Sequence, residues 1–160
     1  MKINGKECEE AKLEQTAFCI LLDEAIKNFN KERKYENLEV LLKTFAYGCL
    51  HREKIIAAAE FAQSNDSNAA NTAENFKNSR LRYLVNENKD VFSIAYTSMD
   101  NYKIFPSDSV VELFLYDVLV RVGTDETVKA LVINPNTETC FVAEKEFIKA
   151  VVNTVNDNLK

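Results

Sequence analysis

The stretch VKALVINPNTETCFVAEKEFIKAVV, residues 128–152, decides the fold of this chain. Residues 129–133 are rich in β-branched side chains and predict a strand, and residues 134–137 then supply turn formers. A returning strand is expected over 139–143. The helix that follows carries apolar residues on one face, namely Phe147, Ile148, Val151, Val152 and Val155. Strand, turn, strand and amphipathic helix in this order are typical of an α+β protein.

A second strand pair is expected upstream. Residues 81–85 and 91–96 form apolar runs joined by turn formers at 86–90, which is a strong hairpin signal. Thr97 or Ser98 can cap a short helical turn after the second run.

A longer helix is predicted after this turn. Residues 106–108 have the composition of a helix start, and Gly123 is placed to end the helix. Apolar residues at helical spacing lie between them: Val110, Val111, Phe114, Leu115, Val118 and Val122.

The N-terminal part of the chain predicts two amphipathic helices. The first covers residues 9–30, with an apolar stripe of Phe18, Leu21, Leu22, Ala25, Ile26 and Phe29. The second carries Tyr35, Leu38, Leu41, Leu42 and Phe45, and Gly48 is placed as its C-terminal stop. Two such helices must pack on each other or on the later sheet.

Residues 54–62 are ambiguous, because their alanines favour a helix while their length suits a buried strand. The Asn-rich residues 63–79 have little to bury and predict a mobile loop, with an interdomain linker as the alternative. We therefore expect one α+β domain over 1–160. A helical segment over 1–50 packs on a small mixed sheet region over 54–160 with two further helices.

Composition argues against several classes of protein. The 160 residues are 46% hydrophobic and 28% charged, with a net charge of −5 and basic residues mixed among acidic ones, which disfavours nucleic-acid binding. Met1 leads into polar residues, so no secretory signal is expected, and the early apolar run at 17–22 is far short of the roughly 20 residues that cross a membrane. Four cysteines without CxxC spacing then indicate reduced thiols in a cytoplasmic protein.

Two short motifs resemble a known family. The hairpin runs into Tyr96-Thr97-Ser98, and Ile133-Asn134-Pro135 stands at a strand end before a short strand and a helix. In order and spacing, residues 35–152 are similar to the N-terminal domain of the SseB family, the bacterial enhanced serine sensitivity proteins, which typically have Phe-Thr-Ser at the first motif. The resemblance implies a strand for 54–62. The long Asn-rich loop departs from the family, as does the lack of the second domain found in its longer members.

The family is named for a phenotype, so the resemblance implies no catalytic residues. The motifs make Thr97, Ser98, Asn134 and Pro135 the candidate binding residues, although turn formation and helix capping also explain them.

Few residues suggest reactive chemistry. Cys49 and His51 could begin a metal site, but a tetrahedral site needs four ligands and no second pair is present. Cys49, near His51 and Arg52, is also the best candidate nucleophile. With three glycines in the chain, no glycine-rich phosphate loop can be written, and the acidic side chains between Glu7 and Glu24 are typical of a solvated helix face.

We therefore expect a non-enzymatic, SseB-like cytoplasmic protein that acts as a protein-interaction or regulatory module, with another protein as partner and no cofactor or metal. One alternative is a sensor of an amino acid or metabolite, with a pocket between sheet and helices. The other is an enzyme that uses Cys49.

Overall fold

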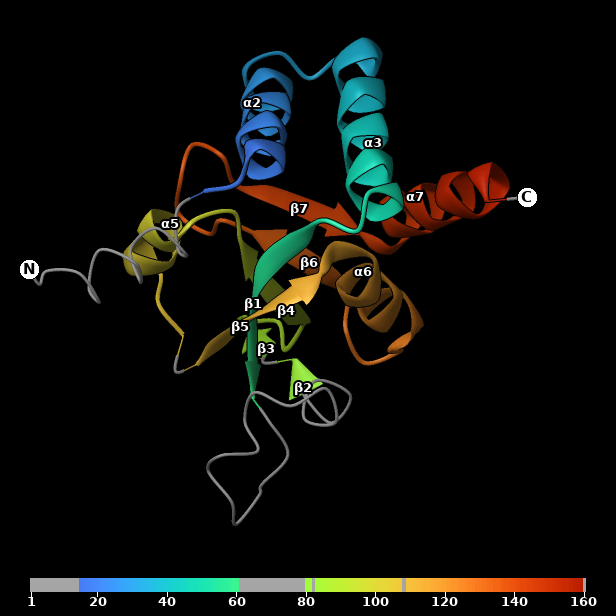
Figure 1. The fold of residues 1–160 in the computed structure, drawn as a ribbon. Coiled ribbons are helices and arrows are strands. Elements are labelled where there is room, and N and C mark those ends of the chain that lie inside the picture. The colour runs from blue at the N-terminus through green and yellow to red at the C-terminus, as the bar shows by residue number, and fades with distance from the viewer. Residues whose placement is uncertain (1–14, 61–79, 82, 108, 160) are drawn as a thin grey trace, which may run out of the picture.

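The computed structural model describes residues 15–60, 80–81, 83–107 and 109–159, and the chain folds as an α+β protein (Figure 1). The helices are α2 (Ala17–Lys31), α3 (Tyr35–Leu50), α5 (Met99–Ile104), α6 (Leu115–Thr124) and α7 (Lys145–Asn158). The strands are β1 (Lys54–Glu60), β2 (Arg80–Leu81), β3 (Tyr83–Val85), β4 (Val91–Tyr96), β5 (Val110–Phe114), β6 (Ala130–Ile133) and β7 (Phe141–Glu144). The predicted Asn-rich loop at 63–79 lies outside the described residues.

The sheet is mixed, as predicted. Its strand order is β2-β1-β4-β6-β7, with β5 also paired to β1 and β3 also paired to β4. Every pair is antiparallel except β4 with β6. Parallel neighbours need a crossover connection, and here α5, β5 and α6 provide it. The carboxyl ends of β4 and β6 therefore lie together at one end of the sheet.

The ambiguous segment at 54–62 is a strand over Lys54–Glu60. It pairs with β2, β4 and β5, so Ala57, Ala58 and Ala59 are buried inside the sheet. Sheet pairing on both sides outweighs the helix propensity of the alanines.

The prediction of a helix from residue 106 is wrong for the first half of that helix. Residues 110–114 form β5, which pairs with β1 along its whole length, and α6 begins only at Leu115. The apolar side chains at helical spacing belong to two elements, and the β-branched Val110 and Val111 lie in the strand. The other predicted elements are present: the hairpin, a short helix capped by Ser98, strands β6 and β7, and the final helix.

The helix predicted to begin at residue 9 starts at Ala17. The Thr16 hydroxyl caps it by accepting a hydrogen bond from the Cys19 amide at 3.1 Å; residues 9–14 lie outside the described part. Leu21, expected on the apolar stripe, is 57% exposed. Tyr35 is likewise exposed.

Gly48 does not end its helix, because α3 continues to Leu50. A side-chain carbon added at Gly48 would overlap the Phe18 ring from α2. The glycine therefore lets the two helices of the hairpin approach closely.

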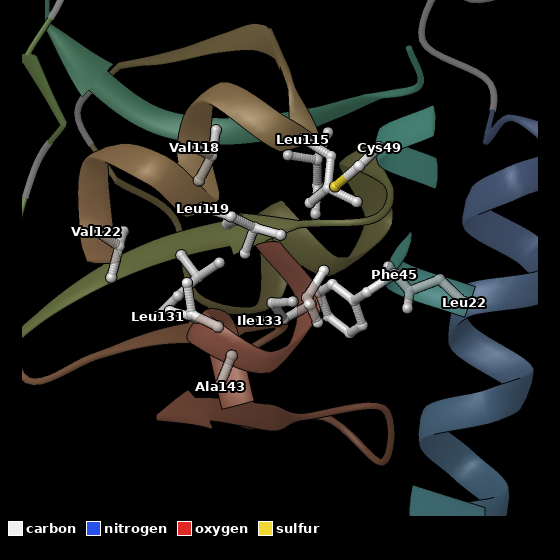
Figure 2. Packing of buried hydrophobic residues seen from close by; sticks show 14 of the residues in the cluster. Leu22, Phe45, Cys49, Leu115, Val118, Leu119, Val122, Leu131, Ile133 and Ala143 are labelled. Atoms are coloured by element: carbon white, nitrogen blue, oxygen red, sulfur yellow. The ribbon is translucent and has the colours of Figure 1, made fainter. Parts of the chain in front are cut away.

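The main hydrophobic core lies between the sheet and helices α2, α3, α6 and α7. Leu22 and Phe45 extend this core into the α2–α3 hairpin, and Figure 2 shows Phe45 reaching toward Ile133 of β6. Phe45, Phe141 and Phe147 pack with their ring centroids 5.1–6.0 Å apart. A smaller cluster under α5 covers the other face of the sheet and contains Ala58, Ile94 and Tyr96. None of the helices in the described segments is long and apolar enough to span a bilayer.

Candidate functional site

A partly buried polar cluster lies at the end of the sheet where β4 and β6 finish, with Thr97 and Asn134 as its buried members. Thr97 directly follows β4 and Asn134 directly follows β6. Because these strands are parallel neighbours, the two motifs singled out in the sequence meet there. We call Asp23, Thr97, Asn101, Asn134 and Thr139 the polar cluster.

Thr97 and Asn134 bind each other twice. The Thr97 amide donates to Asn134 Oδ1 at 2.9 Å, and Asn134 Nδ2 donates to Thr97 Oγ1 at 2.9 Å. The side chain of Asn134 also lies 3.0 Å from Thr139 Oγ1. Asn134 is fully buried and has a φ of 53°, a left-handed conformation that asparagine tolerates better than most residues. The Asn134 side chain therefore links the carboxyl end of β6 to the carboxyl end of β4 by hydrogen bonds.

Asp23 brings helix α2 into the cluster. Its Oδ1 accepts hydrogen bonds from Thr97 Oγ1 at 2.5 Å and from Asn134 Nδ2 at 3.2 Å, while its Oδ2 accepts one from Gln15. Burial raises the pKa of the Asp23 carboxyl, and the hydrogen bonds from Thr97, Gln15 and Asn134 together with the charge of Lys27 partly oppose that rise.

The side chains of the polar cluster serve as one another's hydrogen-bond donors and acceptors. Asn101 Nδ2 donates to Thr97 Oγ1 at 3.0 Å, so the threonine hydroxyl donates one hydrogen bond and accepts two. The geometry of the polar cluster suits a latch that fixes α2 to the sheet, because Asp23 of α2 accepts hydrogen bonds from the residues that directly follow β4 and β6.

The other two candidate residues have structural roles. The Ser98 hydroxyl caps α5 by accepting from the Asn101 amide at 3.2 Å, and Pro135 is buried in the turn after β6. Sequence reasoning missed Asp23. It lies beside the apolar stripe of α2 and has the pattern of a solvated residue, so only the tertiary fold reveals its partners.

Cys49 and His51 do not form a shared site. The Cys49 thiol points into the core near Leu115 (Figure 2), and burial raises its pKa to about 12. His51 is exposed and stacks on Tyr47 with ring centroids 4.1 Å apart. A thiol with this pKa is almost entirely protonated at neutral pH. Among the residues that the structure describes, no three His, Cys, Asp or Glu side chains gather as metal ligands would.

A groove lies between α6 and α7, on the far side of the sheet from α5 (Figure 1). It encloses about 250 Å³ and is mostly apolar. Its lining residues are Leu119, Val120, Gly123, Thr124, Lys145, Ile148, Lys149, Val152 and Asn153. None of the residues singled out as candidate binding residues lies in it.

Comparison with known proteins assigns no family to these features. The similarity of the Thr97 and Asn134 motifs to the SseB family therefore stays a prediction from the sequence. No family model matches the chain, and neither a curated protein nor a solved structure matches it.

Proposed function

We propose that this protein is a non-enzymatic interaction module that binds another protein through the α2–α3 hairpin. The observation that carries the proposal is the apolar surface of these helices. Large apolar side chains that are at least 36% exposed lie on both of them: Ile20, Leu21, Tyr35, Val40, Tyr47 and Leu50. Figure 1 shows the hairpin standing at one end of the molecule, beyond the sheet.

The exposed face of α3 is the best defined part of this surface. Val40, Tyr47 and Leu50 are 53%, 48% and 36% exposed, and their spacing places them on one side of the helix. The opposite side carries Leu41 and Phe45, which are fully buried in the core. The exposed side chains are therefore not required to hold α3 in place, and an apolar face with an aromatic residue and charged neighbours is typical of an interaction surface.

The test is copurification from the cells in which the protein occurs. We expect the wild type to recover a partner at a stoichiometric level and the Val40→Glu/Tyr47→Glu variant to lose it. Ile104→Glu is the matched control, because Ile104 is 56% exposed on α5. Thermal unfolding must be similar for all three proteins. The proposal is wrong if no stoichiometric partner is recovered, or if the double variant retains the partner as well as the control does.

As part of the same proposal we place the protein in the cytoplasm, as an SseB-like regulator. Cys19, Cys49 and Cys140 are free thiols in the described segments, which supports a reducing compartment.

A second candidate function is small-molecule binding, which the groove between α6 and α7 favours. The sequence predicted such a pocket between sheet and helices, whereas this groove lies between two helices. A mostly apolar hollow with a few polar groups at its rim is the usual form of a small-ligand site.

A further inference from the structure

We infer that the groove between α6 and α7 binds a small amphipathic monocarboxylate, with its apolar body between the helices and its carboxylate at Lys149. The inference rests on the second candidate function, small-molecule binding. It involves helices other than the α2–α3 hairpin, so the two proposals can be tested separately.

The walls of the groove are apolar. Leu119 and Val120 contribute from α6, and Ile148 and Val152 contribute from α7. Gly123 keeps the groove open, because a carbon added there would lie 3.2 Å from Ile148 Cγ2 and longer side chains would extend into the space. A volume of about 250 Å³ is close to the lower end of the range of ligand pockets, about 300 Å³, which suits a small ligand.

The charged groups at the groove are both cationic. Lys145 and Lys149 line it, and no acidic side chain does, although the chain as a whole has a net charge of −5. Local charge thus favours an anion where the overall charge would repel one.

Lys149 is the better anion ligand of the two. Lys145 Nζ already donates to the Asp125 carbonyl oxygen at 2.5 Å. Lys149 is exposed, and within the described part of the chain it has neither an ion pair nor a hydrogen bond from its side chain. Thr124 also lines the groove, but its Oγ1 donates to the Val120 carbonyl at 2.8 Å. One unengaged ammonium beside an apolar groove matches a ligand with a single negative charge and an apolar body.

The test compares three probes that share an eight-carbon chain and differ in the head group: octanoate, octanol and octylamine. Each is titrated into the full-length protein while amide NMR shifts are recorded. We expect octanoate to shift the amides of Gly123, Ile148 and Val152 and to bind up to about five-fold more tightly than octanol, the upper limit for a solvent-exposed ion pair. Octylamine should bind more weakly than either, because its ammonium meets Lys149.

Variants assign the roles within the groove. Lys149→Gln should bind octanoate and octanol equally, whereas Lys103→Gln on α5, also an exposed lysine, should keep the wild-type ratio. Gly123→Leu should lose all three probes by filling the groove. If Gly123→Leu does not fold, Val120→Gln on the groove wall should weaken binding of octanoate and octanol alike.

The outcomes separate the ligand class from the site. Shifts in the groove with octanol but no advantage for octanoate would show that the groove binds ligands and that the carboxylate assignment is wrong. No shift in the groove with any probe would overturn both the inference and the second candidate function. Retention of the wild-type ratio in Lys149→Gln would remove Lys149 from the site.

Discussion

Asn134 combines a left-handed backbone with a fully buried side chain, and Asn136 in the same turn has a similar backbone, φ 63°, with an exposed side chain. Substitutions at these two residues therefore distinguish the energetic cost of backbone strain from that of lost hydrogen bonds. We predict that Asn136→Ala costs about 1 kcal/mol of unfolding free energy, from strain alone. Asn134→Ala should cost about 3 kcal/mol, because it also leaves the Thr97 amide without its acceptor. Urea unfolding measures both, and equal losses would contradict the role given to the Asn134 amide.

Asp23 makes stability depend on pH. Because burial raises its pKa above the usual 3.8, the folded protein binds this proton more tightly than the unfolded chain does. The unfolding free energy that this tighter proton binding adds is fully present below the pKa of Asp23 in the unfolded chain. It is lost as pH rises through the pKa of Asp23 in the folded protein.

We therefore predict that the unfolding free energy of the wild type, relative to Asp23→Asn, falls as pH rises above about 3.8 and then levels off once Asp23 is ionised in both states. The asparagine keeps an oxygen that can accept from Thr97 and Asn134. Urea titrations at a series of pH values measure the difference. A difference that grows with pH would mean that the hydrogen bonds outweigh burial.

Some residues of the polar cluster can be identified from the sequence. Thr97 and Asn134 can be selected from their motifs, and their contact follows from the parallel pairing of β4 with β6. Asp23 cannot be selected in this way. Its partners in the two motifs lie 74 and 111 residues away, and nothing near it in the sequence distinguishes it from a solvated acid.

Helix α3 and strand β5 show where patterns along the chain mislead. Val110 and Val111 fit the spacing of a helix, yet β5 pairs with β1 over five residues, and sheet pairing decides the outcome. A glycine at this point of the pattern is typical of a helix C-terminus. Gly48 instead lies within α3, where it packs against the Phe18 ring of α2. Elements whose pattern and pairing agree, such as the β3–β4 hairpin and α7, are predicted well.

The contact at Gly48 predicts the effect of an alanine. Gly48→Ala gains about 1 kcal/mol of helix propensity, but overlap with the Phe18 ring costs about 1–3 kcal/mol, so we expect net destabilisation. Combined with Phe18→Leu, the same substitution should cost less, and a double-mutant cycle of unfolding free energies measures this coupling.

Gly123→Ala in α6 is the control for this cycle, since the added carbon meets only Ile148 Cγ2 at 3.2 Å, and its effect should stay within about 1 kcal/mol. If Gly48→Ala stabilises the protein, or if Phe18→Leu leaves its cost unchanged, the two helices do not depend on the glycine for close packing.

Across the whole molecule, the main core joins side chains from Phe18 to Val155, and two thiols lie inside it. Burial raises the pKa of Cys19 to about 11 and that of Cys49 to about 12. We predict that in a Cys8→Ser/Cys140→Ser variant both remaining thiols react with an aromatic disulfide reagent only through opening of the core.

The labelling rate should therefore rise with urea in parallel with the unfolded fraction measured by circular dichroism. A Cys49→Ser version of this variant reports Cys19 alone. Rapid labelling of Cys49 in the native protein would contradict the burial of this thiol and would support Cys49 as a candidate nucleophile.

The latch at Asp23 has a consequence for a chain that is still being made. Helices α2 and α3 leave the ribosome before the sheet does. Asn134 emerges 111 residues after Asp23, and the rings of Phe141 and Phe147 that cover Phe45 emerge later still. Until residues 134–147 have emerged, the hairpin lacks its hydrogen bonds to Asn134 and the aromatic rings that cover Phe45. The apolar inner surface of the hairpin is exposed throughout that interval, so the nascent protein should depend on a holding chaperone.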